Sequence, residues 1–396
     1  MRGQAKGDKS PKFHVEGWHP ATAAFVGASG FLVLAMTVLG ALLWTTRMPL
    51  EPSWSLPVLV TSLGAGGAAG LTLKNLNLKR AESRRSTNVM FDGQFETGAR
   101  LLGGNSESEV LAGSLLLGSL LRESPRHAQA CADLLCAALR RQQKSDLTSD
   151  ELAEMLPDIP ESYFADRTIA IRMRNALAAA IKRAATYDAS ATHLRSVRWD
   201  FEGTYFGDRA DLSGCIFGPG TRFKDVIAVG LLDLSHSRFV GSCGIVNVSA
   251  PQGLHMGHAS VERTLYIEDS AFGQDSDANF GVFLLSVVAG DVQIHKVCSR
   301  GSLHLDDASI RSEVDVGDSV FRSLSFTGAS SGGAARFLRL RVDGDFTVAN
   351  VTIRKGFLVE SCSATGDFGV RGVHAGGRVV VRDSMGSTTV VDEPSG

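Results

Sequence analysis

The second half of the chain repeats an apolar pattern with a period of 11, and this period limits the possible folds more than any other feature. Two apolar residues separated by one position recur, and from Val292 onward their first members follow at steps of 11, 11, 10, 22, 11, 11 and 11. The pairs are Val292/Ile294, Leu303/Leu305, Val314/Val316, Leu324/Phe326, Phe346/Val348, Phe357/Val359, Phe368/Val370 and Val379/Val381. A fixed period of this kind indicates a repeat architecture.

Two irregular steps lead us to predict a 22-residue coil. The pairs Val246/Val248 and Leu338/Leu340 are each reached by a step of 14 and followed by a step of 8. A 22-residue coil absorbs both departures, whereas an 11-residue coil would lose its register. We therefore expect a parallel β-helix over residues 199–391, about 40 Å long at ~4.8 Å per coil, and a tail over residues 392–396. An insertion is expected around residues 274–278.

Small residues are expected to complete the interior of each coil. They come three positions after the second member of a pair, as in Ala308, Ser319, Cys362 and Ser384. A continuous apolar column built in this way would offset the backbone entropy that a single coil could not recover.

The first coils carry a second, finer pattern. Phe201, Phe206, Leu212, Phe217 and Phe223 follow one another at steps of 5, 6, 5 and 6, and residues 210–214 read ADLSG. This segment resembles the pentapeptide repeat family, and the resemblance implies a right-handed quadrilateral β-helix. Residues 95–127 and 175–183 are similar to the helical linker of bacterial membrane proteins of that family. The resemblance thus implies an anchor, a linker and a solenoid.

Two uncharged apolar runs precede the repeats. A basic N-terminus, residues 1–20, is followed by predicted transmembrane helices at 21–46 and 52–73, with basic residues outside both ends. The first run is long enough to cross a bilayer, and the positive-inside rule places both termini in the cytoplasm of a bacterium. A signal peptide is the competing interpretation of the first run. The hairpin predicts a lipid bilayer partner for residues 21–73.

A helical linker domain is expected over residues 87–191. Ser106 and Glu109 have capping-box spacing, Ser124-Pro125 is expected to begin the next helix, and Thr148 and Glu151 a short third one. A fourth helix follows the apolar spacing between Ile169 and Ile181. Its basic residues are expected to face solvent, and they are Arg172, Arg174, Lys182 and Arg183.

Few residues suggest chemistry. The six cysteines contain no C-x-x-C and are expected to fill space, and they are Cys131, Cys136, Cys215, Cys243, Cys298 and Cys362. His255 and His258 have H-x-x-H spacing without a fixed acidic partner, so we interpret them as surface residues. We predict no catalytic, cofactor-binding or metal-binding residue, and no cofactor.

Outward carboxylates keep an enzymatic alternative open. Alternation places six acids on the outside of the coils, where stacking could bring some together for glycoside cleavage, and they are Glu268, Asp269, Asp306, Asp307, Asp315 and Asp318. A second alternative is an acidic rod that imitates DNA, as the resemblance allows. From Leu194 onward there are 24 Asp and Glu against 19 Lys and Arg, a mild net charge of −5.

The fold class we predict is an α+β membrane protein with a transmembrane hairpin, a helical linker and a right-handed parallel β-helix. Its expected role is that of a non-enzymatic scaffold whose solenoid binds a protein partner in the cytoplasm. Self-association is a further possibility. Nucleic acid is not expected as a partner, because 40 basic and 42 acidic residues nearly balance.

Overall fold

The computed structural model describes residues 52–104, 106–141, 161–186, 192–207, 209–273, 281–386 and 388–391. The chain forms two compact units, Met1–Met90 and Phe91–Gly396. The predicted helix at 21–46 lies outside the described residues, and residues 52–73 lie in a longer helix. No helix in the described part of the chain is both long and apolar enough to cross a membrane. The helices are α2 (Pro52–Leu102), α3 (Glu107–Glu123), α4 (Ala128–Arg141), α6 (Glu161–Ala185) and the 3-10 helix η2 (Thr192–Ser196).

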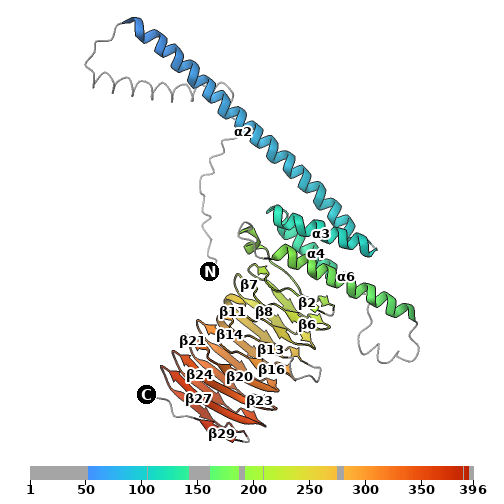
Figure 1. Cartoon of the computed structure of the whole chain (residues 1–396), viewed down its shortest axis with the longest axis vertical. Helices are drawn as coiled ribbons and strands as arrows, with labels where there is room; N and C mark the ends of the chain where they lie inside the picture. The colour runs from blue at the N-terminus through green and yellow to red at the C-terminus, as the bar shows by residue number, and fades with distance from the viewer. Residues whose placement is uncertain are drawn as a thin grey trace, which may run out of the picture. The chain divides into compact units, whose positions relative to one another are not determined.

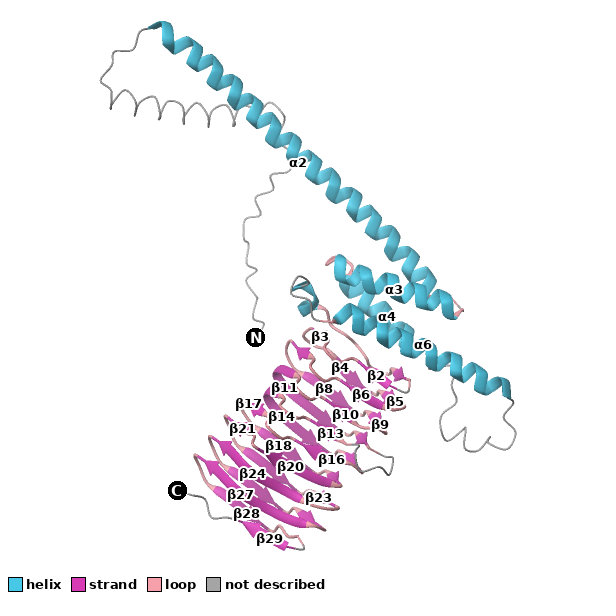
Figure 2. Ribbon diagram, in the orientation of Figure 1, coloured by secondary structure: helices cyan, strands magenta, loops and turns pink. Residues whose placement is uncertain are grey.

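From Tyr205 onward the chain winds into a parallel β-solenoid of right-handed type with about eight turns (Figures 1 and 2). Every pairing between its named strands is parallel, and the strands form one sheet of 8 and one of 21. The smaller sheet contains β1 (Tyr205–Phe206), β5 (Ile227–Ala228), β9 (Ser249–Ala250), β12 (Ala271–Phe272), β15 (Cys298–Ser299), β19 (Val320–Phe321), β23 (Arg341–Val342) and β26 (Ser363–Ala364).

The larger sheet contains the remaining strands, which wrap around the other sides of the coils. They are β2 (Arg209–Asp211), β3 (Ile216–Phe217), β4 (Arg222–Lys224), β6 (Leu231–Asp233), β7 (Arg238–Phe239), β8 (Cys243–Val246), β10 (Leu254–His255), β11 (Ser260–Glu268), β13 (Val282–Phe283), β14 (Val288–His295), β16 (Ser302–His304), β17 (Ser309–Ile310), β18 (Val314–Gly317), β20 (Ser323–Thr327), β21 (Ser330–Ser331), β22 (Ala335–Leu338), β24 (Phe346–Ile353), β25 (Phe357–Glu360), β27 (Asp367–Ala375), β28 (Val379–Arg382) and β29 (Thr388–Val391).

The predicted 22-residue coil is confirmed by the strand register. Ile245 pairs with Ile267, and Phe346 pairs with Phe368. The expected insertion lies outside the described residues, but the strand pairing on either side of it shows between which residues it lies. Phe272 still pairs with Ala250, one regular coil earlier, whereas Val282 pairs with Leu254 across a step of 28 along the chain. The extra residues therefore lie between Phe272 and Val282.

Our reason for choosing the 22-residue coil was nevertheless wrong. Leu338 faces outward, and the inward pair of its strand is Ala335/Phe337, which follows Leu324/Phe326 at the regular step of 11. In the same way, Cys243/Ile245 takes the place that we gave to Val246/Val248. The 11-residue period therefore continues without a break there. We missed both pairs because alanine and cysteine are too small to stand out in an apolar pattern.

Each coil sends four pairs of side chains inward. In one coil they are Val292/Ile294, Val297/Ser299, Leu303/Leu305 and Ala308/Ile310, all of which are buried. The five residues from Phe201 to Phe223 with steps of 5 and 6 are fully buried as well. Each half coil contains two inward pairs, so each coil has four short sides. This explains why the 11-residue period divides into the steps of 5 and 6.

A residue with positive φ turns the chain once in every half coil. Such residues recur at steps of 10 or 11 from Gly203 to Asp383, except for the step of 17 from Asp269 to Ser286 that spans the insertion, and most are Asp, Asn, His or Gly. Asp and Asn tolerate this conformation better than other residues with a side chain. At Asp225 and Asp318 the backbone N–H still donates to the next coil, at 3.0 Å in both cases. The turn therefore keeps the coil-to-coil hydrogen bonds.

The predicted small interior residues satisfy the backbone at another turn. Ala308, Ser319 and Cys362 are buried, and Ser384 is half-buried. The hydroxyl of Ser319 accepts a hydrogen bond from the N–H of Val297, one coil earlier, at 3.0 Å and donates to the carbonyl of Gly317. A buried N–H without such a partner would cost about 1–3 kcal/mol.

Helices α4 and α6 cover the first coil (Figure 1). The Arg140 guanidinium donates to the carbonyls of Asp200 and Glu202, and Lys182 pairs with Asp211 at 2.6 Å. Our prediction for Arg174 was wrong, because this residue is 1% exposed and lies 4.2 Å from the centre of the Tyr205 ring. Arg172 and Arg183 are exposed, as predicted. The helices protect the edge strands of the first coil from pairing with other chains.

The capping box at Ser106 and Glu109 is confirmed. Ser124, however, ends α3 instead of beginning the next helix, because its N–H donates to Leu120 and its hydroxyl contacts His127 Nδ1 at 2.8 Å. Helix α4 begins at Ala128. The expected short helix at Thr148 and Glu151 lies outside the described residues.

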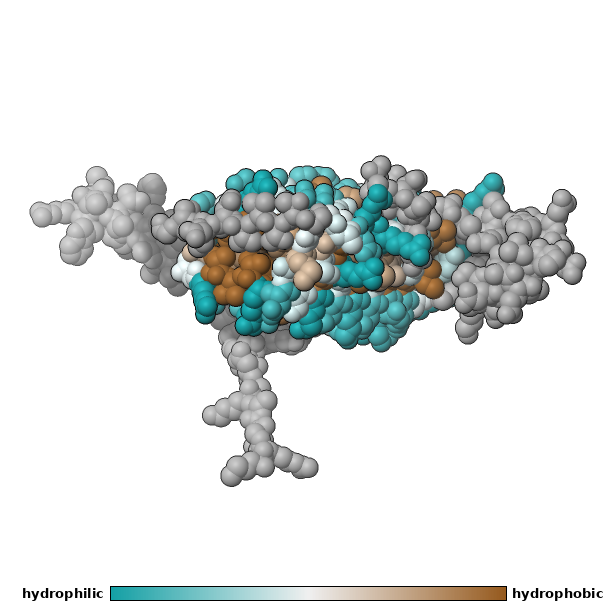
Figure 3. Space-filling model, turned by 90° about the horizontal axis from the view of Figure 1, so that it is seen from below, coloured by the Kyte–Doolittle hydropathy of each residue, from teal (hydrophilic) through white to brown (hydrophobic). Residues whose placement is uncertain are grey.

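At the other end of the solenoid, β28 pairs with β25 on one side, and no strand of the described residues pairs with its other side. Its inward valines, Val379 and Val381, are half-buried, whereas the equivalent Phe357 and Val359 one coil earlier are buried. Viewed from this end, apolar residues gather between hydrophilic ones (Figure 3).

The register of β22 gives a direct test. We expect Phe337→Ala to lower the free energy of unfolding by about 3–5 kcal/mol, because Phe337 is fully buried. Leu338→Ala, at the next and outward position, should cost much less. Denaturant unfolding followed by circular dichroism checks both variants, and a larger loss for Leu338→Ala would contradict this register.

Candidate functional site

The six candidate carboxylates all lie on the outside of the solenoid, as predicted, but on different sides. Asp306 and Asp307 come two and three positions after His304 along the chain. His304 belongs to a row of stacked outward residues that we call the histidine side, formed by Asp211, Asp233, His255, Phe283, His304 and Ser325. The other four lie on or beside the tyrosine side, formed by Arg222, Gly244, Tyr266, Gln293, Asp315 and Arg336. The six therefore do not form one site.

Asp306 lies at the centre of the polar contacts on the histidine side. Its carboxylate accepts hydrogen bonds from the Ser325 hydroxyl at 2.6 Å and the Thr327 N–H at 2.9 Å, and His304 Nδ1 lies 3.3 Å away. Burial raises the pKa of this carboxyl, but the hydrogen bonds outweigh it and the pKa lies below its usual value. Within the described residues the Ser325 hydroxyl donates to Asp306 and makes no hydrogen bond to His304, so the imidazole is not placed to activate Ser325 as a nucleophile.

Ring contacts join the three successive residues His255, Phe283 and His304 of the histidine side. The rings of Phe283 and His304 are parallel at 5.1 Å, and His255 meets Phe283 edge-on at 6.1 Å. The faces of Phe283 and His304 are therefore directed at one another, whereas His255 and Phe283 make a T-shaped contact. Our sequence analysis missed this row, although the steps of 28 and 21 between its rings follow the coil length once the insertion is included.

The tyrosine side holds Glu268 in a similar network. The Tyr266 hydroxyl and the Lys296 ammonium both donate to Glu268. The hydrogen bond from Tyr266 lowers the pKa of Glu268 and raises that of Tyr266 to about 12. Asp315 lies two coils beyond Tyr266 and pairs with Arg336 at 3.7 Å, while its Oδ1 is buried and accepts no hydrogen bond from the described residues.

Asp269 and Asp318 occupy a turn beside the tyrosine side, where charges alternate from coil to coil. Lys296 lies 3.6 Å from Asp269, and Arg339 forms two hydrogen bonds of 2.6 and 2.7 Å with Asp318. The Arg339 hydrogen bond lowers the pKa of Asp318. Opposite charges in successive coils therefore stabilise this edge of the solenoid.

These environments bear on the glycosidase alternative. A general acid for glycoside cleavage needs a raised pKa, whereas the pKa values of Glu268, Asp306 and Asp318 are all lowered. Their contacts are those of carboxylates that remain charged and hold neighbouring coils together.

The two histidines of the H-x-x-H motif point to different partners. His255 is half-buried and its Nδ1 lies 3.7 Å from Asp233, whereas His258 is exposed and stacks on His236 at 5.0 Å. Within the described residues, no group of three or more His, Cys, Asp or Glu is arranged to hold a metal ion.

Five of the six cysteines are buried, in agreement with their predicted role. Burial raises the pKa of the Cys131 and Cys136 thiols to about 12, so both remain protonated. Our prediction was wrong for Cys298, which is exposed because it faces outward in β15.

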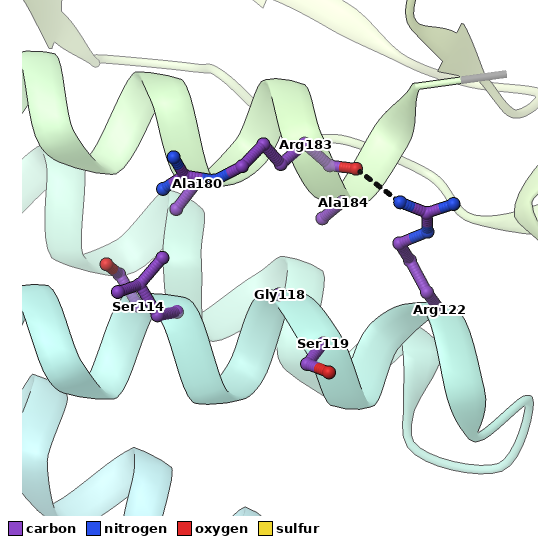
Figure 4. A pocket seen from close by; sticks show the side chains of 8 residues that line it. Ser114, Gly118, Ser119, Arg122, Ala180, Arg183 and Ala184 are labelled. Carbon is purple, nitrogen blue, oxygen red and sulfur yellow. Dashed lines mark hydrogen bonds between the residues drawn. The ribbon is translucent and has the colours of Figure 1, made fainter.

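A shallow pocket of about 230 Å³ lies between α3 and α6 (Figure 4). Gly118 faces Ala180 and Ala184 across the contact, and Arg122 donates to the carbonyl of Arg183 at 3.5 Å. We interpret the pocket as the opening beside a helix contact made by small residues.

Comparisons with protein-family models, curated proteins and solved structures found no match.

The network around Asp306 predicts a pH dependence of stability. A lowered pKa stabilises the fold above the unfolded value of about 3.9, and this contribution is lost as the pH falls through the folded pKa. We expect Asp306→Asn to unfold at a lower temperature than the parent at pH 7, with the difference shrinking toward pH 3. Asp307→Asn, at an exposed neighbouring position, is the control. A difference that stays constant over this range would contradict the assignment.

Proposed function

We propose that this protein is a non-enzymatic scaffold, tethered to a membrane, whose solenoid presents rows of side chains to a protein partner. One observation carries the proposal: outward residues from successive coils form straight rows, such as the histidine side, on a backbone held by coil-to-coil hydrogen bonds. A surface ordered in advance loses little entropy when it binds.

The tether rests on the two apolar runs, 21–46 and 52–73, and on the basic residues outside them. The pentapeptide-like start of the solenoid and the four short sides of its coils support a relationship to pentapeptide repeat membrane proteins. By the positive-inside rule both termini are cytoplasmic. The lowered pKa values of the carboxylates favour the scaffold over a glycosidase.

A charge substitution in the first run tests the tether. An arginine at the centre of a transmembrane helix costs about 2.5–3.5 kcal/mol, so Leu32→Arg/Leu34→Arg should move the full chain from the carbonate-resistant membrane fraction to the supernatant. Leu76→Arg, beyond both runs, is the control. Equal fractions of parent and Leu32→Arg/Leu34→Arg protein in the supernatant would contradict a tether.

A second test addresses the scaffold. A photo-crosslinking residue at Ser325, Ser330 or Leu358 would project from three different rows. We expect discrete protein adducts in cells from one of these rows and weaker adducts from the others. The proposal fails if none of the three positions yields a protein adduct.

A further inference from the structure

One edge of the solenoid carries cations that form no ion pair with any described residue. In each coil this edge comes directly after one row of outward positions along the chain. The row stacks from coil to coil and consists of Ser260, Val288, Ser309, Ser330, Thr352 and His374. We call five exposed residues of this edge the basic edge, namely Arg263, Arg311, Arg354, Lys355 and Arg378. None of the five forms an ion pair with any acid in the described part of the chain. The solenoid region as a whole is acidic, so this clustering is local.

The basic edge has a regular construction. Arginine and glycine alternate over six successive coils, in the order Arg263, Gly290, Arg311, Gly332, Arg354 and Gly376. A side chain on Gly290, Gly332 or Gly376 would overlap the carbonyl of the arginine one coil earlier. The backbones of consecutive arginines are therefore two coils, about 10 Å, apart. The Arg311 side chain extends back along the edge and donates to the carbonyls of Val261 and Glu262, at 3.4 and 2.6 Å.

The acids beside the edge are already engaged. Glu262 pairs with Arg238 at 2.8 Å and Glu313 with Arg336 at 3.4 Å, while Asp291 accepts from the N–H of Glu313 at 3.1 Å. The turn that carries Asp269 and Asp318 differs, because its cations Lys296 and Arg339 are paired from coil to coil. Of the basic edge and this turn, the basic edge is therefore the one whose cations an external anion could bind without breaking an ion pair.

An open hollow adjoins the first arginine of the edge. It has a volume of about 540 Å³ and is lined by Arg222 and Arg263 together with Gly220, Gly241 and Ser242. Arg222 is engaged with Asp200 and Glu202, which leaves Arg263 as the cation available to an anionic group entering this hollow.

We propose that the basic edge binds the anionic headgroups of a phospholipid membrane and so lays the solenoid along the bilayer surface. The inference rests on the proposed tether, which would keep the edge close to anionic lipids. Each Lys or Arg at such a surface contributes about a fivefold gain in affinity. Lipids diffuse laterally and can match arginines about 10 Å apart, whereas single-stranded nucleic acid is usually bound by closely spaced contacts and stacked aromatic rings. The basic edge contains no aromatic residue.

The test uses the full chain reconstituted in nanodiscs of phosphatidylcholine, with or without one third phosphatidylglycerol. Hydrogen exchange over residues 350–360 and acetylation of Lys355 report contact with the bilayer. We expect protection only in the anionic discs, and loss of the protection from hydrogen exchange in Arg354→Glu/Lys355→Glu, which lacks the lysine that is acetylated in the parent. The matched control is Arg300→Glu/Arg322→Glu, which makes the same charge change at two exposed cations half a coil away, and it should remain protected.

The outcomes separate the edge from the tether. Equal protection from exchange and acetylation in discs with and without phosphatidylglycerol would overturn the proposal, as would equal loss of protection in the two double variants. Protection that appears only when polyglutamate or DNA is added would overturn it as well. A chain that does not enter the discs would overturn the tether instead. The edge is then tested by sedimentation of the free chain with vesicles of the same two compositions, and binding that is independent of phosphatidylglycerol would overturn it.

Discussion

The burial of an apolar column between stacked coils is the interaction on which the rest of this structure depends. Each coil sends four pairs of side chains inward, and a buried aliphatic residue contributes about 1.5–3 kcal/mol relative to exposure. The coils can stack only if their backbones pair continuously through the turns. Residues with positive φ meet this requirement, because Asp225 and Asp318 turn the chain while their N–H groups still donate to the next coil.

This construction also determines what the surface can do. Every outward position is repeated at the coil spacing, so side chains from distant parts of the sequence form rows. In the turn with Asp318, opposite charges in neighbouring coils pair and stabilise the stack. In the basic edge, glycines alternate with the arginines from coil to coil, and no acid of the described residues pairs with these arginines. The same scaffold thus produces one neutralised edge and one edge suited to external anions.

The two ends of the solenoid differ for a physical reason. The first coil is closed by helices through Arg140, Lys182 and the buried Arg174. We predicted that Arg174 and Lys182 would face solvent, and we made no prediction for Arg140. The sequence does not distinguish a basic residue that covers a strand edge from one that faces solvent. At the other end, the valines of β28 are only half-buried.

The sequence alone was sufficient for the parallel solenoid, its 22-residue coil and most inward residues, because the apolar period comes directly from the alternation of side chains along stacked strands. It was not sufficient for the small inward residues Ala335 and Cys243, which carry too little apolar character to be recognised. The hydrogen bonds from Ser325 and Thr327 to Asp306, and the absence of an acidic partner for Arg354 among the described residues, were decided by the tertiary structure. Those contacts join residues about one coil apart, and only the register determines which side chains meet.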